Sequence, residues 1–368
     1  MWGPNASGKT TLIEAIALCA RGRSHRTSAD GELIRWGAQF ARVEAHAADP
    51  EVTIEVVLAR DGPAAGRKRL RVNGVARRPA TLGPAMRVVL FAPEEMLLVI
   101  GPPGLRRDAL DRLASDRSPA YARALATYER ALRQRNGLLR AIREETATRA
   151  ELRFWDDAIV DAGAEVLDGR ADLLAALADP LAAAHREIAP DEGGLALAYV
   201  TNAPAHPGER PRDALARRLA ETADKEVWNG ATLVGPHRDD VAFLLDGREM
   251  QGVASRGQQR SAILALKLAE LDLLERLDGR PPLLLLDDVF SELDPARRGH
   301  LVRRISALPQ AFVTTTTLAD LDPDLRAHGT PWRVVADDGP ARDDASATPD
   351  APADAEAGPG ARLEEDAG

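Results

Sequence analysis

The sequence is poor in cysteine and in aromatic side chains. Its 368 residues include a single cysteine, Cys19, and only 4% are aromatic. One thiol cannot form an internal disulfide, which excludes a disulfide-stabilised secreted domain and is typical of a protein of the reducing cytoplasm. Cys19 lies in a stretch of apolar residues with helical spacing, so we expect it to face a hydrophobic core.

Long hydrophobic runs are also absent. A helix needs roughly 18 to 20 uncharged apolar residues to cross a bilayer, and no stretch of the sequence approaches this length. The apolar stretch near the N-terminus does not indicate a signal peptide, because Glu14 lies within it and no basic region precedes it. With 45% hydrophobic and 29% charged residues, the composition predicts a soluble cytoplasmic protein of about two domains, without a membrane partner.

The formal net charge of −9 is concentrated at the C-terminal end. Residues 337–368 hold ten acidic and two basic residues, a net charge of −8, which leaves −1 for residues 1–336. This acidic tail is rich in alanine, proline, glycine and aspartate and has almost nothing to bury, so we predict that it is disordered. Two roles fit it: a solubilising appendage, or a nucleic-acid mimic that inhibits the protein itself.

Residues 3–10, Gly-Pro-Asn-Ala-Ser-Gly-Lys-Thr, match the phosphate-binding loop pattern G-x-x-x-x-G-K-[ST]. In such a loop, glycines let backbone N–H groups surround the phosphates, Lys9 reaches the β and γ oxygens, and the Thr10 hydroxyl holds Mg²⁺. An apolar helical pattern follows, and its N-terminus would point at the phosphates. The loop normally follows a buried strand, whereas only Met1 and Trp2 precede it. We therefore expect that the chain is truncated or its start misassigned, and that it lacks its N-terminal strands; an in-frame upstream extension encoding a β-hairpin and a strand would decide between the two.

The middle of the chain divides into strand-like and helical patterns. Residues 52–58, 70–75 and 88–91 read as strands, with Asn73-Gly74 as a hairpin signal. From about residue 106 to 189, apolar residues recur at spacings of three, four and seven. This predicts an antiparallel helical lobe inserted into an α/β domain. Residues 195–200 then return to a strand pattern.

Two motifs in the last third are ambiguous when each is taken alone. Residues 235–240, Gly-Pro-His-Arg-Asp-Asp, form a turn before the strand pattern of residues 241–245. Residues 255–258, Ser-Arg-Gly-Gln, begin a helical pattern. They offer a hydroxyl, a closely approaching glycine backbone and the positive end of a helix to an anion. A serine that only caps the helix explains the second motif equally well.

A third motif places two carboxylates at the end of an apolar run. Residues 283–286 are all leucine and lead into Asp287 and Asp288, followed by Ser-Glu-Leu-Asp at residues 291–294. This is a Walker B arrangement, in which Asp287 would hold the Mg²⁺ shell and Asp288 would position or deprotonate the attacking water. Carboxylates at the end of a parallel strand are common in α/β proteins, so the motif gains its meaning from the others.

In this order, the phosphate loop, Ser-x-Gly-Gln, the Walker B strand and Ser-x-Leu-Asp are the successive parts of an ABC-type ATPase head, and such heads work as pairs. A longer segment narrows the resemblance. Residues 93–107, Pro-Glu-Glu-Met-Leu-Leu-Val-Ile-Gly-Pro-Pro-Gly-Leu-Arg-Arg, closing in Leu110-Asp111, resemble a signature of the RecF family of bacterial recombination mediators. Residues 22–27, 32–35, 235–240 and 255–260 resemble other segments of that family. Together they extend from residue 2 to about residue 320.

The resemblance implies an α/β, ABC-type P-loop ATPase head related to SMC proteins, with an inserted antiparallel helical lobe and a disordered acidic tail. The expected parts are residues 1–104 and 196–336 for the head, 105–195 for the lobe and 337–368 for the tail. The resemblance also implies ATP and Mg²⁺ as cofactors, a homodimer in the ATP-bound state, and weak DNA-dependent ATP hydrolysis. The implied partners are double-stranded and gapped DNA, bound without sequence preference, and the RecO and RecR proteins, which help to load recombinase.

Site residues carry over by motif. Lys9, Asp287 and Asp288 of one subunit and Ser255 of the other would act in catalysis. Thr10 and Asp287 would hold Mg²⁺, partly through water. The residues expected to contact the nucleotide are Gly3, Asn5, Gly8, Lys9, Thr10, Thr11, Ser255, Gly257 and Gln258.

The chain departs from the family pattern in places. Pro102 and Ala109 stand where the signature prefers a small or acidic residue and an aromatic one, which puts the local packing in question. Four threonines, residues 314–317, replace the switch histidine usual in transporter heads, which favours the RecF family and predicts slow turnover. Two alternatives stay open: another ABC-type ATPase, either SMC-like or a transporter head, and a clamp that binds ATP and DNA without hydrolysis.

DNA contacts are expected from basic clusters, and the sequence does not choose among them. Binding through phosphates would be independent of sequence and would weaken steeply with salt. Each cluster could equally face solvent or pair with acids. The candidates are Arg21, Arg23 and Arg26; Arg67, Lys68 and Arg69; Arg77 and Arg78; and Arg106 and Arg107.

Overall fold

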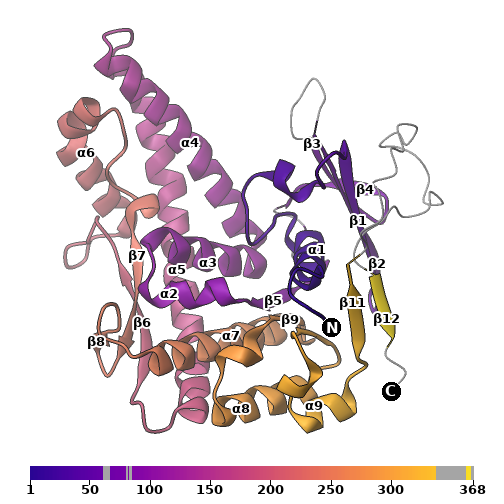
Figure 1. The fold of residues 1–368 in the computed structure, drawn as a ribbon. Coiled ribbons are helices and arrows are strands. Elements are labelled where there is room, and N and C mark those ends of the chain that lie inside the picture. The colour runs from indigo at the N-terminus through magenta and orange to yellow at the C-terminus, as the bar shows by residue number, and fades with distance from the viewer. Residues whose placement is uncertain (61–66, 80–81, 83–84, 337–361, 366–368) are drawn as a thin grey trace. The chain divides into compact units, whose positions relative to one another are not determined.

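The computed structural model describes residues 1–60, 67–79, 82, 85–336 and 362–365. The chain forms two compact units: unit 1 comprises residues 1–95 and 274–368, and unit 2 comprises residues 96–273 (Figure 1). Helix α7 (Arg256–Asp278) belongs to both. The predicted division had its internal boundaries at residues 104/105 and 195/196. The compact units differ from it because the strands that follow the helical region pack with those helices.

A parallel sheet in unit 1 contains the strand that ends in the Walker B acids. Strands β5 (Val88–Phe91), β9 (Leu283–Asp287) and β10 (Ala311–Thr314) pair in the order β10-β9-β5, and both pairings are parallel. Strand β5 and residues 283–286 of β9 are continuous apolar runs because a parallel sheet is covered on both faces. The strand patterns predicted at residues 88–91 and 283–286 are thus confirmed.

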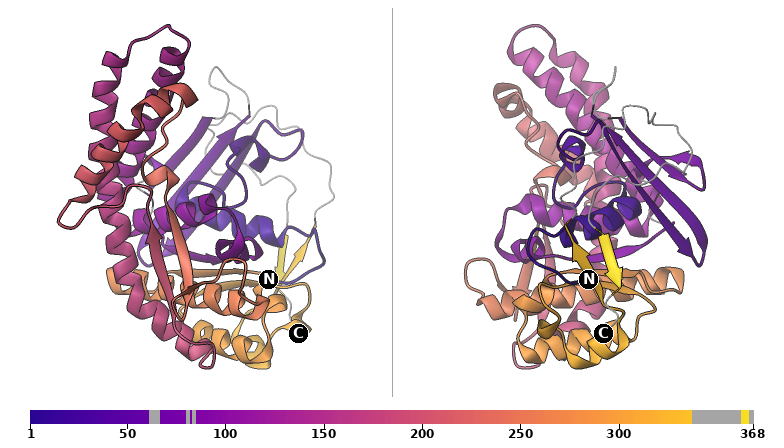
Figure 2. Two further views of the ribbon diagram at one scale, coloured as in Figure 1. Left: turned by 90° about the vertical axis from the view of Figure 1, so that its left-hand side faces the viewer. Right: turned by 45° about the vertical axis from the view of Figure 1, so that its right-hand side comes forward.

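Trp2 takes a strand position beside this sheet. It forms parallel bridges to Thr315, just after β10, and to Arg333 in β11 (Trp332–Val335). Its N–H donates to the Trp332 carbonyl at 2.8 Å, and the Val334 N–H donates to the Trp2 carbonyl at 2.8 Å. Both views in Figure 2 show the N-terminus next to β11. The phosphate loop therefore starts at the end of a strand-like segment.

An antiparallel sheet forms the other layer of unit 1. Its strands are β1 (Phe40–Ala48), β2 (Glu51–Ala59), β3 (Arg67–Val72) and β4 (Val75–Arg77), paired in chain order. The turn between β3 and β4 is Asn73-Gly74, with φ of 50° and 77°. Positive φ at both central residues is what a two-residue hairpin requires, so the predicted hairpin is confirmed.

Helix α1 (Lys9–Arg21) packs between the two sheets of unit 1. Its Leu18 and Cys19 join the core of the antiparallel sheet, whereas Ile13 and Ala17 join the core of the parallel sheet. Cys19 is fully buried, as predicted. Burial raises the pKa of its thiol to about 12, so it stays protonated and unreactive at neutral pH.

The C-terminal part of unit 1 contains a strand within the tail that was predicted to be disordered. After α8 (Pro295–Ser306) and α9 (Pro323–His328), β11 pairs antiparallel with β12 (Arg362–Glu365). The prediction of a disordered tail is wrong for these four residues; the rest of the tail lies outside the described residues. A sheet edge offers backbone N–H and C=O groups to any strand, whatever its side chains, so composition did not reveal this pairing.

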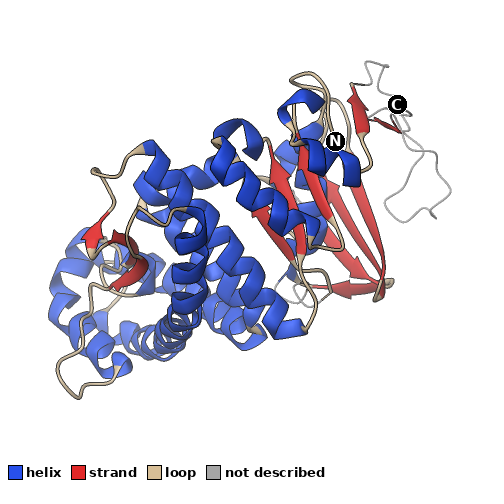
Figure 3. Ribbon diagram, turned by 90° about the horizontal axis from the view of Figure 1, so that it is seen from below, coloured by secondary structure: helices blue, strands red, loops and turns tan. Residues whose placement is uncertain are grey.

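Unit 2 is mostly helical (Figure 3). Its helices are α2 (Leu97–Ile100), α3 (Pro103–Arg117), α4 (Pro119–Arg143), α5 (Leu152–Ile188) and α6 (Pro211–Asn229). Helices α4 and α5 run antiparallel as predicted, and α6 packs on both (Figure 1). Strands β6 (Leu195–Val200), β7 (Asp240–Leu245) and β8 (Arg248–Glu249) form a small antiparallel sheet.

Pro102 suits its position in unit 2, because it is the N-cap of α3, in extended backbone, and Pro103 opens the helix. None of the helices in the described ranges is long and apolar enough to cross a membrane.

Candidate nucleotide-binding site

The phosphate loop is tightly folded on itself. Gly3 and Gly8 have φ of 156° and 102°. A Cβ at Gly3 would lie 2.5 Å from the Val334 carbonyl oxygen, so only glycine fits there. The Lys9 ammonium donates to the carbonyls of Gly3 and Pro4, both at 2.8 Å. The loop therefore curls around the lysine that would meet a phosphate.

A hydrogen bond joins the loop to the first predicted acid of the Walker B strand, and Thr314 joins that acid to the backbone of the second. The Thr10 hydroxyl donates to Asp287 Oδ1 at 3.2 Å. The Thr314 hydroxyl, in register with Asp287 on the neighbouring strand, donates to the same oxygen at 2.7 Å. The Asp288 N–H in turn donates to Thr314 Oγ1 at 2.9 Å. One threonine thus fixes the two aspartates relative to each other.

Burial and backbone conformation distinguish the two acids. Asp287 is buried, with 5% exposure. Asp288 has φ of 51°, in the left-handed region that few residues other than glycine adopt. Burial lowers the pKa of Lys9, while the carboxylates of Asp288 and Asp287 raise it. The three ionisable groups therefore share one small volume at the end of β9.

The segment that follows α1 adds a histidine that the sequence analysis did not single out. Both ring nitrogens of His25 are inaccessible and have no hydrogen-bond partner in the described part of the chain. Burial lowers its pKa, against the opposing effect of Glu14, Glu94 and Asp287. Ser24 anchors the segment, because its hydroxyl donates to Glu14 on α1 and accepts the Thr27 N–H at 3.2 Å. Burial thus favours the neutral form of the His25 imidazole.

The donor set fits Mg²⁺. Hydroxyl and carboxylate oxygens are the ligands this ion prefers, and it commonly takes one or two from protein and the rest from phosphates and water. Thr10 and Asp287 supply one of each within hydrogen-bond distance. Within the described ranges, no group of three or more His, Cys, Asp and Glu side chains could hold a metal without help. The site therefore fits an ion that arrives with phosphate.

The Ser-x-Gly-Gln segment forms a helix cap. Gln258 N–H donates to Ser255 Oγ at 3.2 Å, and Ser255 N–H donates to Gln258 Oε1 at 2.9 Å. This reciprocal pair is a capping box at the start of α7. Ser255, Gly257 and Gln258 belong to unit 2, whereas the phosphate loop with Asn5 and Thr11 and the acids belong to unit 1. The capping explanation of this serine therefore holds within one chain.

Residues 235–240 take part in a buried polar network of unit 2. Arg170, 2% exposed, donates to Asp111 through two nitrogens at 2.8 and 2.9 Å and to the Pro236 carbonyl at 2.8 Å. Tyr199 donates to Asp239 at 2.8 Å. His237 lies 2.6 Å from the Tyr128 hydroxyl through Nδ1. The motif thus joins the loop before β7 to the helices of the lobe.

Two basic clusters contain side chains that are paired within the chain. Arg106 is 5% exposed and forms two hydrogen bonds of 2.7 Å to Asp240. It therefore pairs with an acid, which was one of the alternatives left open by the sequence. Lys68 donates to the Gly22 carbonyl at 2.8 Å and pairs with Asp30 at 2.6 Å. Neighbouring residues of a strand point to opposite faces, so Lys68 and Arg69 do not form one patch. Arg77 and Arg78 are exposed.

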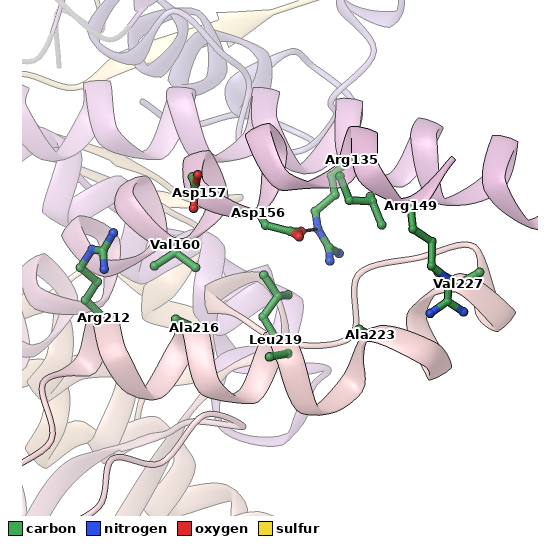
Figure 4. Close-up of a pocket in the computed structure, with 12 residues that line it drawn as sticks. Arg135, Arg149, Asp156, Asp157, Val160, Arg212, Ala216, Leu219, Ala223 and Val227 are labelled. Atoms are coloured by element: carbon green, nitrogen blue, oxygen red, sulfur yellow. Dashed lines mark hydrogen bonds and ion pairs between the residues drawn. The ribbon is translucent and has the colours of Figure 1, made fainter. Parts of the chain in front are cut away.

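A cavity of about 360 Å³ lies in unit 2 between α4, α5 and α6 (Figure 4). It contains none of the predicted site residues. Its three arginines are already paired with acids: Arg135 with Asp156 and Glu226, Arg149 with Asp224, and Arg212 with Asp161. Because the positive charges are compensated locally, we assign no anionic ligand to it.

Comparisons with known proteins agree with this geometry. A family model described as "RecF/RecN/SMC N terminal domain" matches residues 1–322. The DNA replication and repair protein RecF of Heliobacterium modesticaldum is 40% identical over 338 residues, which are 91% of this chain and 90% of that protein. RecF of Symbiobacterium thermophilum is 42% identical over 326 residues, 87% of this chain and 86% of that protein.

A solved structure of the recombination mediator protein RecF with ATP, in the RecFOR pathway, superposes with a TM-score of 0.81 at 31% identity. The match covers 91% of this chain and 88% of that one. The predicted ABC-type head with an inserted helical lobe is thereby confirmed. The chain belongs to the RecF family of DNA replication and repair proteins.

Proposed function

We propose that this chain is an ATP-dependent DNA-binding protein of recombinational repair. It dimerises when ATP binds, holds double-stranded DNA near gaps, and releases it after weak ATP hydrolysis, which assists RecO- and RecR-type mediators in loading recombinase. The observation that carries the proposal is the hydrogen-bonded series Thr10, Asp287, Thr314 and Asp288. It links the phosphate loop to both acids of a hydrolytic site. The ATP complex of the similar RecF protein supports the choice of nucleotide.

Binding of ATP would redirect the loop's own contacts. Lys9 would exchange the Gly3 and Pro4 carbonyls for β- and γ-phosphate oxygens, whose negative charge favours the ammonium form that burial disfavours. Thr10 and Asp287 would hold Mg²⁺, which neutralises phosphate charge when bound. The N-terminus of α1, at Lys9, carries no acid in its first turn and adds a favourable dipole.

Asp288 is the group we assign to the attacking water. Its backbone N–H is fixed by Thr314, and its left-handed conformation sets the direction of its side chain independently of Asp287. Asp288 would accept a proton from water as the water oxygen bonds to the γ-phosphorus and the bond to ADP breaks. Asp287 would remain with the metal ion. Two adjacent carboxylates thus take different roles because only one is buried against the loop.

Dimerisation would complete the site with residues of the other subunit. Ser255, Gly257 and Gln258 would meet the γ-phosphate bound to the other subunit, at the positive end of α7. ATP drives assembly only through contacts that the monomer lacks. A near-complete switch needs roughly 10⁴-fold preference, about 5.5 kcal/mol. Several charge-assisted hydrogen bonds of about 1.5 to 3 kcal/mol each could supply it.

An Asp288→Asn variant tests the enzymatic part. We expect it to keep ATP-dependent dimers, measured by light scattering, and to lose phosphate release by at least about 100-fold, as loss of a general base typically does. Asp324→Asn, an exposed aspartate of α9 in the same unit, is the matched control and should behave as wild type. Wild-type phosphate release from Asp288→Asn would rule out the assigned role.

Measurements on the wild type separate the alternatives. A clamp that binds ATP and DNA without hydrolysis would release no phosphate in the wild type either. A transporter head would co-purify with a polytopic membrane protein and would not bind DNA. A wild-type chain that stays monomeric when saturated with a non-hydrolysable ATP analogue would refute ATP-driven dimerisation. DNA affinity that does not change with salt would refute binding through phosphates.

A further inference from the structure

Trp36 is the most exposed large apolar side chain among the described residues of unit 1, with 91% exposure. An indole of this kind buries on the order of 150 to 250 Å² when it is packed. The sequence holds only five tryptophans. Tryptophan is enriched among the residues that contribute most of the binding energy at contact surfaces.

The loop that carries Trp36 is held rigidly. The Ala38 N–H donates to the Arg35 carbonyl at 3.0 Å, which closes a turn around Trp36 and Gly37. Gly37 has φ of 84°, the left-handed conformation that the third position of a type II turn requires. The Arg60 guanidinium donates to the Ile34 carbonyl at 2.8 Å, and Ile34 is buried in the core of unit 1. The indole is therefore presented on a fixed base, so binding would cost little ordering of the chain.

The surroundings of Trp36 in the sequence are positively charged. Residues 21–42 contain five arginines and two acids. Asp30 pairs with Lys68 at 2.6 Å, and Glu32 accepts from the Thr27 hydroxyl. Two of the arginines are paired with acids, Arg26 with Glu14 at 3.6 Å and Arg42 with Glu55 at 2.8 Å. Arg23 and Arg35 are exposed on the same segment as Trp36. An exposed aromatic among exposed arginines suits a polyanion with flat rings better than it suits an apolar protein surface.

We propose that Trp36 stacks on a base at the junction between single-stranded and double-stranded DNA, with Arg23 and Arg35 contacting the flanking phosphates. This inference rests on the proposed DNA binding and adds the feature by which a gap is recognised. Bases within a continuous duplex are stacked on both sides. At a gap, the terminal pair and the first unpaired base each have a free face, on which an aromatic ring can stack whatever the sequence.

The test compares gapped with continuous duplex DNA in the presence of a non-hydrolysable ATP analogue, by fluorescence anisotropy. For Trp36→Ala we expect affinity for gapped DNA to fall about tenfold, the scale of one lost base–aromatic contact, with continuous duplex affinity unchanged. Trp36→Phe should retain most of the preference because it can still stack. Trp228→Ala is the matched control, since Trp228 is also exposed, at 80%, but lies on α6 in unit 2.

A second readout reports stacking directly. With 2-aminopurine as the base next to the gap, wild type and Trp36→Phe should quench its fluorescence, and Trp36→Ala should not. The inference is overturned if Trp36→Ala keeps the preference for gaps or loses both substrates equally. It is also overturned if the variant loses only dimerisation, which would make Trp36 a protein contact. A wild type that binds continuous and gapped DNA equally refutes the inference alone, whereas one that binds neither also refutes the proposed function.

Discussion

Replacing Thr314 by valine removes one hydroxyl and leaves the side-chain volume almost unchanged. Thr314 is fully buried, so the methyl group that replaces the hydroxyl creates no cavity. Its hydroxyl donates to Asp287 Oδ1 at 2.7 Å and accepts the Asp288 N–H at 2.9 Å. The substitution therefore isolates the polar role of this residue from its packing.

The expected loss of stability follows from these two hydrogen bonds. A hydrogen bond to a charged group contributes about 1.5 to 3 kcal/mol, and a buried N–H left without an acceptor costs about 1 to 3 kcal/mol. Because Asp287 keeps the Thr10 hydroxyl, we expect a net loss of about 2 to 4 kcal/mol in the free energy of unfolding. Asp288 would also lose the contact that fixes its backbone. A displacement of about 1 Å at a reacting group can slow catalysis by about 100-fold.

The assay pairs urea unfolding with single-turnover phosphate release. Thr314→Ser should restore most of both properties because it restores the hydroxyl. Thr316→Val is the matched control, since its hydroxyl makes only a 3.4 Å contact to Asp320. ATP affinity, measured with a fluorescent analogue, should change less than phosphate release because Lys9 and the loop are intact. If Thr314→Val unfolds and hydrolyses like wild type, Thr314 does not position the two acids.

Two further predictions concern the buried network of unit 2. Burial lowers the pKa of His237 to about 4, with a hydrogen bond to the Thr232 carbonyl acting against it. The unfolded chain binds the proton first, near pH 6.5, so this stability is complete above pH 6.5 and is lost as the pH falls toward 4. We expect about 2 kcal/mol less stability at pH 5 than at pH 7. This part of the pH dependence of urea unfolding should be absent from His237→Gln; an equal dependence in both proteins would contradict it. Arg170→Met leaves the Asp111 carboxylate without its guanidinium and should cost about 3 to 5 kcal/mol. Arg212→Met, at an exposed pair with Asp161, should cost less than about 1 kcal/mol. Similar urea midpoints for these two variants would show that burial does not set the cost.

The elements that could be predicted are those with a local signal. The Asn73-Gly74 turn, the apolar strands β5 and β9 and the heptad-like spacing of α4 and α5 are each visible within a short window of sequence. Helix α6 was missed because its apolar face is narrow, with Leu215 and Leu219 among many charged residues. Strand β12 was missed because its pairing uses backbone groups of β11.

The same distinction applies to the site. The phosphate loop and the Asp287-Asp288 pair were evident because their chemistry needs fixed residue types at fixed spacing. The sequence analysis treated Thr314 only as the replacement of a histidine. Its place at the end of β10, the strand that pairs with β9, was the signal for its contact with Asp287. Arg106 was a candidate for DNA binding because nothing in its neighbourhood in the sequence reveals Asp240, 134 residues away.

By itself, the sequence determined the motifs of this protein: the phosphate-loop pattern, the Walker B pattern with its two acids, and the alternation of strands and helices. Only the tertiary structure decided which side chains meet and which face solvent. Thr10 and Asp287 are 277 positions apart, yet they share a hydrogen bond. Trp36, an apolar residue, is 91% exposed, whereas Arg106, a charged residue, is 5% exposed. Each is the opposite of what its residue type suggests. The reason is physical: backbone preference and apolar periodicity act over a few residues, whereas burial and pairing depend on the whole folded chain.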